Sequence, residues 1–404
     1  MGGDPSRVRV TGPLAVFAGG FAGELARLGY KRNSVADQLR LMAHLSRWMD
    51  AGHLEAAELT PQVTRAFLAA RRAAGYVLWL SPKALVPLLG YLRRLGVVPV
   101  PASAPVPPAE ALLVRYRRYL LTERGLADTT ARGYADMVRP FLAGRDEPDG
   151  LGLGQLTAAE VTGFVLATCP GMPKGSAKLT VTALRSLLGF LHVDGVIGEP
   201  LGQYVPSVAS WRLAGLPRAL EPGQIQALLG SCDRRTAAGR RDFAMLTLLA
   251  RLGLRAGEVA ALTLEDIDWR AGEIMVRGKG SRCERLPLPA DVGEAITGYL
   301  RDGRPEPFEG GRQVFLRARA PHRALTTGGV SGAVCTAGRR AGIGLVHAHR
   351  LRHSAATGML RAGAPLTEIG QVLRHRRLLS TAIYAKADTA ALRALARPWP
   401  GGAA

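Results

Sequence analysis

Hydrophobic residues recur every three or four positions along most of the chain, which is the spacing of amphipathic helices. Serine or threonine precedes several of these runs, in the position that caps a helix N-terminus. The pattern changes at residues 273–277 and 285–288, two short strand-like runs that flank the glycine-containing segment 278–281. These runs predict a β-hairpin. The sequence therefore predicts a mainly α fold with a small β-sheet.

Two proline-containing segments divide the chain. Residues 99–108 contain five prolines, which prevent a helix or an inner strand and indicate a stiff extended linker. Residues 199–216 carry two more prolines together with scattered glycine and serine. We therefore expect three domains, at residues 1–98, 109–198 and 217–404.

The first two of these domains repeat each other. The run LTPQVTRAFL from Leu59 matches LTAAEVTGFV from Leu156, and LLGYLRRLGVV from Leu88 matches LLGFLHVDGVI from Leu187. The offsets of 97 and 99 residues drift slowly, as small loop insertions would make them. Each domain is expected to be a bundle of about four helices. Arginine-rich helical stretches such as residues 112–121 suit a face that binds DNA, and a solvated helix face is the alternative.

The charge balance points to a polyanionic partner. The chain has 404 residues, and 53 Lys and Arg against 32 Asp and Glu give a formal net charge of +21, which favours nucleic acid. The hydrophobic fraction of 47% excludes a mainly disordered chain. Four widely spaced cysteines are typical of an intracellular protein with free thiols, and no apolar run reaches the length of a membrane span. We expect a cytoplasmic protein with no membrane partner.

Two basic residues of the third domain stand in unusual settings. Arg255 follows a buried apolar helix and lies between two glycines, so its permanent charge needs an anionic partner. That partner is either Glu258, one turn further on, or a phosphate. Lys279 lies in the turn of the predicted hairpin, in a chain where arginine outnumbers lysine by 47 to 6. Lysine can release a proton where arginine cannot, so Lys279 is a candidate proton donor, with a chance exposed lysine as the alternative.

The last third of the chain gathers histidines and one tyrosine. His349 and His353 are spaced like a zinc pair on a helix, but neighbouring arginines and the lack of a nearby carboxylate or cysteine argue against a metal. His349 and Arg352 share a helix face and would combine a proton-transfer group with a phosphate clamp. His375 precedes Tyr384 by nine residues. Alone, Tyr384 would be interpreted as a half-buried packing residue.

Taken together, these residues resemble the tyrosine recombinase (phage integrase) family. The family has an arginine in a G-L-R-x-x-E setting, a hairpin lysine, H-x-x-R, a His or Trp, and a nucleophilic tyrosine nine residues later. Residues 217–388 match this order, and one departure is Arg374, which stands where a glycine usually precedes the histidine. Residues 109–198 resemble the family's helical SAM-like core-binding domain, and residues 1–98 a diverged second copy. The catalytic residues that the resemblance implies are Arg255, Lys279, His349, Arg352, His375 and Tyr384.

The resemblance implies a role for each residue. Tyr384 would attack a DNA phosphodiester and form a 3′-phosphotyrosyl bond, while the two arginines clamp the non-bridging oxygens. Lys279 would protonate the leaving 5′-oxygen, His349 would assist proton transfer at the tyrosine, and His375 would donate a hydrogen bond to the phosphate. No metal, cofactor or ATP is expected to be needed.

The expected function is therefore that of a site-specific integrase or recombinase from a phage or transposon. Its partners would be double-stranded DNA, three further protomers in a tetramer on two DNA sites, and accessory recombination proteins. Residues 389–396 form a short helical pattern that would dock on a neighbouring protomer or fold back on its own domain. The alternatives are a type IB topoisomerase, which shares the chemistry, and a catalytically silent DNA-binding relative.

Overall fold

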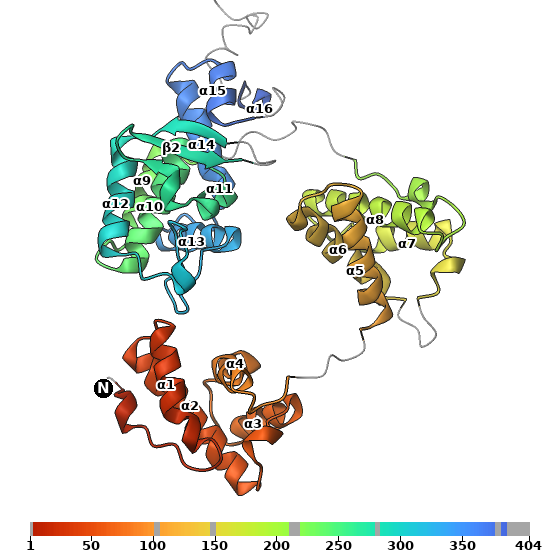
Figure 1. Ribbon diagram of the computed structural model, residues 1–404. Coiled ribbons are helices and arrows are strands. Elements are labelled where there is room, and N and C mark those ends of the chain that lie inside the picture. Colours follow the sequence, from red (N-terminus) through yellow and green to blue (C-terminus); the bar gives the residue numbers. More distant parts are fainter. Residues whose placement is uncertain are drawn as a thin grey trace, which may run out of the picture. The chain divides into compact units, whose positions relative to one another are not determined.

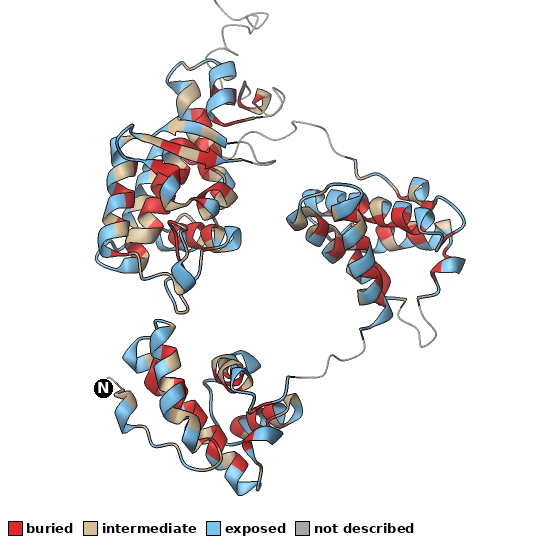
Figure 2. Cartoon of the chain, viewed as in Figure 1, coloured by how far each residue is buried: buried red, intermediate tan, exposed pale blue. Residues whose placement is uncertain are grey.

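The computed structural model describes residues 3–100, 106–145, 151–209, 219–278, 283–375 and 381–385 (Figure 1). These residues are mainly helical, with one three-stranded sheet, which confirms the predicted fold class. The buried residues are concentrated on the helix faces that point into each bundle (Figure 2). Among the described residues, no helix is long and apolar enough to span a membrane.

Residues 3–100 contain four α-helices that enclose one hydrophobic core. The helices are α1 (Ala18–Arg27), α2 (Arg32–Ala51), α3 (Pro61–Ala73) and α4 (Val86–Arg94). Their core includes Phe21, Met42, Leu45, Phe67 and Leu88. The side chain of Thr60 caps α3 by accepting a hydrogen bond from the Val63 N–H at 3.3 Å. This bond satisfies one of the backbone N–H groups of the first turn that have no partner within the helix.

Residues 106–209 form a second bundle of four α-helices. These are α5 (Pro108–Thr122), α6 (Asp128–Ala143), α7 (Ala158–Thr168) and α8 (Lys174–Val193). Tyr116 is fully buried in its core, and its hydroxyl donates to the Ala183 carbonyl at 3.3 Å. Thr157 caps α7 at the position that matches Thr60 in the sequence repeat. The repeated LT pair therefore marks the same local structure in both bundles.

Residues 219–385 combine eight further described α-helices and the sheet. The strands β1 (Ile267–Asp268), β2 (Glu273–Arg277) and β3 (Cys283–Pro287) pair antiparallel in that order, with Ile274 opposite Leu286. The predicted hairpin is present, but β3 begins at Cys283 rather than at residue 285, because pairing with Arg277 extends the ladder toward the turn. The helices other than those at the site below are α9 (Pro222–Gly230), α10 (Ala237–Leu252), α12 (Ala290–Asp302) and α13 (Thr327–Arg340).

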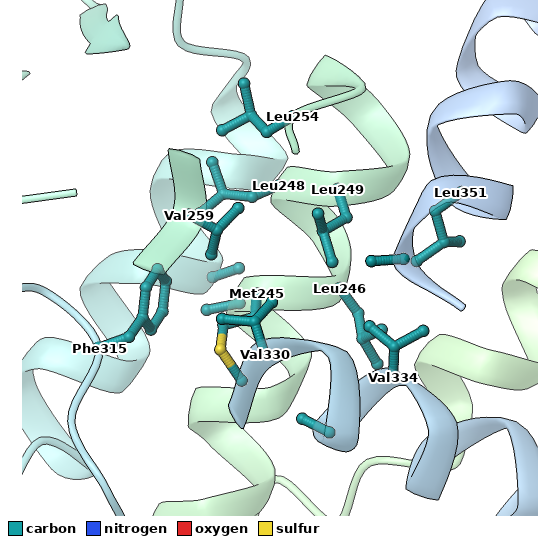
Figure 3. Close-up of a cluster of buried hydrophobic side chains, with 14 of the residues drawn as sticks. Met245, Leu246, Leu248, Leu249, Leu254, Val259, Phe315, Val330, Val334 and Leu351 are labelled. Carbon is teal, nitrogen blue, oxygen red and sulfur yellow. The ribbon is translucent and has the colours of Figure 1, made fainter. Parts of the chain in front are cut away.

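The core of this region is built around α10. Its buried residues Met245, Leu246, Leu248 and Leu249 meet side chains from several other elements (Figure 3). Those side chains include Val259, Phe315, Val330, Val334 and Leu351. A smaller cluster joins Ala356, Ile369, Leu373 and Tyr384. Because α10 ends at Leu252, this packing fixes the position of Gly253 and of the arginine that follows it.

The division into three domains stays a prediction. The chain forms two compact units, one made of residues 1–101 and 215–404 and the other of residues 102–214. Residues 14–98, 109–205 and 220–351 nevertheless each have a hydrophobic core of their own.

Replacing Gly253 by alanine should destabilise the fold beyond the cost of its backbone conformation. Gly253 has φ +58°, and a Cβ there would lie 2.7 Å from Cδ2 of Leu373, which is fully buried and has little room to move. Gly272→Ala is the matched control, since Gly272 has φ +65° and no atom within 4 Å of such a Cβ. We expect Gly272→Ala to cost about 1–2 kcal/mol and Gly253→Ala clearly more, measured by urea unfolding. Equal losses would show that the contact with Leu373 is not tight.

Candidate active site

Arg352 is buried beneath the surface of the site. It lies on α14 (Ala348–Arg361), and only 1% of the residue is exposed to solvent. Its Nη1 donates to the Gly253 carbonyl at 2.6 Å, and its Nη2 donates to the Leu373 carbonyl. These bonds connect α14 to the end of α10 and to the residue after α15 (Leu366–Val372). The guanidinium is thus held in one orientation by backbone from two sides.

Arg255 is the more accessible arginine of the site. It is the N-cap residue of α11 (Ala256–Ala261), and its side chain is 41% exposed. Its Nη1 donates to Oε1 of Glu258 at 2.6 Å, and its Nη2 donates to the Arg374 carbonyl at 3.5 Å. Glu258 is therefore a partner of Arg255, as the sequence allowed. The exposed part of the guanidinium leaves room for an anion as well.

The positive charges of this region exceed its negative charge. Burial, together with the charges of Arg255 and Arg374, lowers the pKa of Arg352 to about 10, although Glu258 acts in the opposite direction. Burial disfavours the ionised form of Glu258, but the Arg255 backbone N–H and the nearby arginines outweigh it and hold its pKa below the ordinary value. Three guanidinium groups thus face one carboxylate. An arrangement with this surplus of buried positive charge favours an incoming phosphate.

Tyr384 lies in α16 (Ala382–Ala385) and is 1% exposed. Its hydroxyl is 2.9 Å from Nδ1 of His353, and the ring of His375 lies parallel to its own ring at a centroid distance of 6.3 Å. Burial raises the pKa of Tyr384, and the charge of Arg352 partly offsets this effect. The phenol therefore needs a base beside it if it is to act as a nucleophile.

The histidines around Tyr384 are neutral at neutral pH. Burial, then the neighbouring His349 and Arg352, lower the pKa of His353 to about 4. Burial, Arg352 and Arg255 lower the pKa of His375 to about 4 and also depress the pKa of His349. The rings of His349 and His353 pack edge to face at 4.4 Å, and Nδ1 of His375 is 2.8 Å from Oγ1 of Thr381. A neutral histidine has a free ring nitrogen that can accept a proton.

Most of the predicted site residues come together. Contacts or shared neighbours link Arg255, His349, Arg352, His375 and Tyr384, whereas Lys279 lies outside the described residues. Sequence analysis assigned no catalytic role to His353, which contacts Tyr384 across 31 positions of the chain. Its spacing from His349 was the available signal. Across the described ranges, no group of three His, Cys, Asp or Glu residues is arranged to hold a metal ion.

Comparison with known proteins places this chain in a family. The sequence model of the phage integrase family matches residues 218–391, and that of the phage integrase N-terminal SAM-like domain matches residues 113–195. The chain is 40% identical over 402 residues to the integrase/recombinase y4rA of Sinorhizobium fredii, covering 97% of this chain and 96% of that protein. The chain belongs to the phage integrase family of tyrosine recombinases. Enzymes of this family cleave and rejoin DNA strands.

Other relatives and solved structures agree. The chain is 31% identical over 281 residues to the tyrosine recombinase XerD of Listeria monocytogenes, covering 68% of this chain and 93% of the relative. The fold is similar to that of the XerH site-specific recombinase bound to its difH substrate, with a TM-score of 0.55, 18% identity, and coverage of 73% and 97%. The likeness of residues 1–98 to a second SAM-like domain stays a prediction.

The neutral histidines should make the fold less stable in mild acid. His353 and His375 have a pKa of about 4 when folded against an ordinary 6.5, so the unfolded chain binds more protons between these values. Their stabilisation is fully present above about pH 6.5 and is lost as the pH falls toward about 4. We expect the thermal unfolding midpoint to drop between about pH 7.5 and about pH 5, and to drop less in His353→Gln. An identical drop in both proteins would rule out His353 as a source of this dependence.

Proposed function

We propose that this tyrosine recombinase cleaves double-stranded DNA at specific sites through Tyr384. The phenolic oxygen attacks the scissile phosphorus, the P–O5′ bond breaks, and the 3′ end remains attached as a phosphotyrosyl ester. Attack by the 5′-hydroxyl of another strand reverses the step and rejoins the DNA without ATP. The observation that carries the proposal is the position of the Tyr384 hydroxyl. It lies 2.9 Å from Nδ1 of the neutral His353, and the charge of Arg352 partly offsets the rise in its pKa that burial causes.

The arginines stabilise the charge that develops during attack. Negative charge builds on the non-bridging oxygens, and fixed guanidinium groups in a buried site can stabilise it without reorganising. Arg352 is already fixed by two carbonyl oxygens. Arg255, with its partly exposed side chain, is the group that can close on the phosphate from outside. The two side chains together form the phosphate clamp.

Proton transfer at the nucleophile falls to His353 in this proposal. Its Nδ1 is within hydrogen-bond distance of the Tyr384 hydroxyl, and its ring is neutral at neutral pH, so Nδ1 can accept the phenolic proton in the tautomer that is protonated on Nε2. His349, for which the resemblance implies this task, packs edge to face against His353 and supports its ring. His375 stacks beside Tyr384 and is proposed to donate a hydrogen bond to the phosphate. Lys279, between β2 and β3, is proposed to protonate the leaving 5′-oxygen.

Assembly on DNA is proposed from the solved relatives. One similar structure is a lambda integrase tetramer bound to a Holliday junction, with a TM-score of 0.52, 17% identity, and coverage of 68% of this chain and 76% of that one. We propose that the protein forms a homotetramer on two DNA sites in the cytoplasm. We further propose that a phage or transposon encodes it and that accessory proteins are additional partners. A type IB topoisomerase is disfavoured by the likeness to an integrase/recombinase over 97% of the chain. The docking of residues 389–396, which lie outside the described residues, remains part of this proposal.

Covalent capture tests the proposal. Nicked fragments of the host's own DNA should trap the wild-type protein as an adduct that resists denaturing electrophoresis. A nick beside the cleavage site lets the short fragment that carries the released 5′-hydroxyl diffuse away, so the strand cannot be rejoined. Mass spectrometry of the digested adduct should find the nucleotide on Tyr384. Tyr384→Phe should give no adduct, since the ring remains but the oxygen is gone.

The same assay, with the captured sequence as an oligonucleotide, tests the base. His353→Gln should slow adduct formation by roughly 100-fold, within the usual range for general-base catalysis, while DNA binding persists. An undiminished adduct in Tyr384→Phe would move the nucleophile elsewhere. A wild-type rate in His353→Gln would remove only the role of His353.

A further inference from the structure

Arg374 occupies an unusual position next to the phosphate clamp. It follows α15 with φ +54°, in the left-handed region, and its side chain is 4% exposed. Its Nη2 donates to Oε2 of Glu258 at 2.7 Å, and its Nη1 donates to the Val372 carbonyl at 3.0 Å. Its own carbonyl accepts from Arg255 at 3.5 Å. Arg374 therefore touches the clamp twice, directly and through Glu258.

The stability of the fold does not explain an arginine here. A left-handed backbone favours glycine, and burying a guanidinium is costly even when it is paired. The Nε–H of Arg374 is also buried, and none of the described residues accepts a hydrogen bond from it. Glycine would avoid all three costs. A residue that carries these costs at the edge of a candidate active site points to a function in that site.

The charges around Glu258 suggest what this function is. The Glu258 carboxylate accepts from the Arg255 N–H at 2.8 Å, from Arg255 Nη1 at 2.6 Å and from Arg374 Nη2 at 2.7 Å. With glycine at position 374, Glu258 and Arg255 would form a closed pair whose charges cancel. With Arg374 present, one carboxylate is shared by two guanidinium groups, so Arg255 is held in place and the group keeps a surplus positive charge.

We propose that Arg374 is a positioning residue that balances the charge of Glu258, so that Arg255 stays oriented and free to bind the scissile phosphate. This inference rests on the proposed cleavage through Tyr384. Arg374 itself does not touch the DNA, because its side chain is enclosed. It acts through Glu258 and through the backbone beside it: Arg374 donates to the Val372 carbonyl, and the neighbouring Leu373 carbonyl accepts from Arg352.

The test compares three variants in single-turnover cleavage of the captured oligonucleotide at saturating protein. Arg374→Gly should fold at least as well as the wild type, because glycine suits φ +54°, yet should form the adduct on the order of tenfold more slowly or worse. Arg374→Lys, which keeps the charge, should regain most of the rate. The control Arg301→Gln removes an exposed arginine paired with Asp302 at 3.0 Å, and should cleave within about twofold of the wild type.

A double-mutant cycle separates charge balance from simple packing. If Arg374 acts by balancing Glu258, then Arg374→Gly should cost little more in a Glu258→Gln background, where no charge needs balancing. Additive losses, an Arg374→Lys as slow as Arg374→Gly, or an Arg374→Gly within twofold of the wild type would each overturn the inference. Failure of the wild type to form any Tyr384 adduct would instead refute the proposed function, so the two failures are distinguishable.

Discussion

The burial of one permanent charge is the constraint on which the site depends. Arg352 cannot lose its proton under ordinary conditions, and its hydrogen bonds in the free protein go to the carbonyl oxygens of Gly253 and Leu373. Carbonyl dipoles compensate a buried cation less well than an anion does. The fold therefore stores unfavourable electrostatic energy that a bound phosphate can relieve. Gly253, with its left-handed backbone, and the buried Leu373 present those two carbonyls to the guanidinium.

The proposed nucleophile, Tyr384, lies in the same low-polarity environment. Burial raises the pKa of Tyr384 while it lowers the pKa of His353, so the proton rests on the phenol and the base beside it is empty. Both shifts have desolvation as their largest cause. In the proposed mechanism, a bound phosphate changes the local charge, and the proton moves from the phenol to His353 over the 2.9 Å between the two atoms. The exclusion of water is thus the main cause of the shifted pKa values of both Arg352 and Tyr384.

Sequence reasoning predicted the parts of this account that depend on local pattern. Threonine caps, which the structure has at Thr60 and Thr157, the amphipathic helices and the hairpin follow from residue periodicity and turn chemistry. The order of Arg255, Arg352 and Tyr384 along the chain was enough to indicate the tyrosine recombinase family. The strand boundary at Cys283 was missed because pairing with Arg277, not propensity, decides where the ladder ends.

Contacts made by folding were beyond the sequence. His353 was recognised only as a neighbour of His349, because nothing in the chain shows that α14 and α16 bring it against Tyr384. That Arg374 stands where the family has a glycine was visible in the sequence. Its left-handed backbone and its hydrogen bond to Glu258 depend on tertiary packing. The role of Lys279 still rests on resemblance. Residues that act through distant partners are the ones that a single sequence leaves undetermined.

A structure of the protein covalently trapped on its nicked DNA site tests the central claim most directly. We expect a phosphate bonded to the phenolic oxygen of Tyr384, with its non-bridging oxygens within hydrogen-bond distance of both Arg255 and Arg352. A phosphate linked to any other residue, or one that contacts neither arginine, would contradict the account.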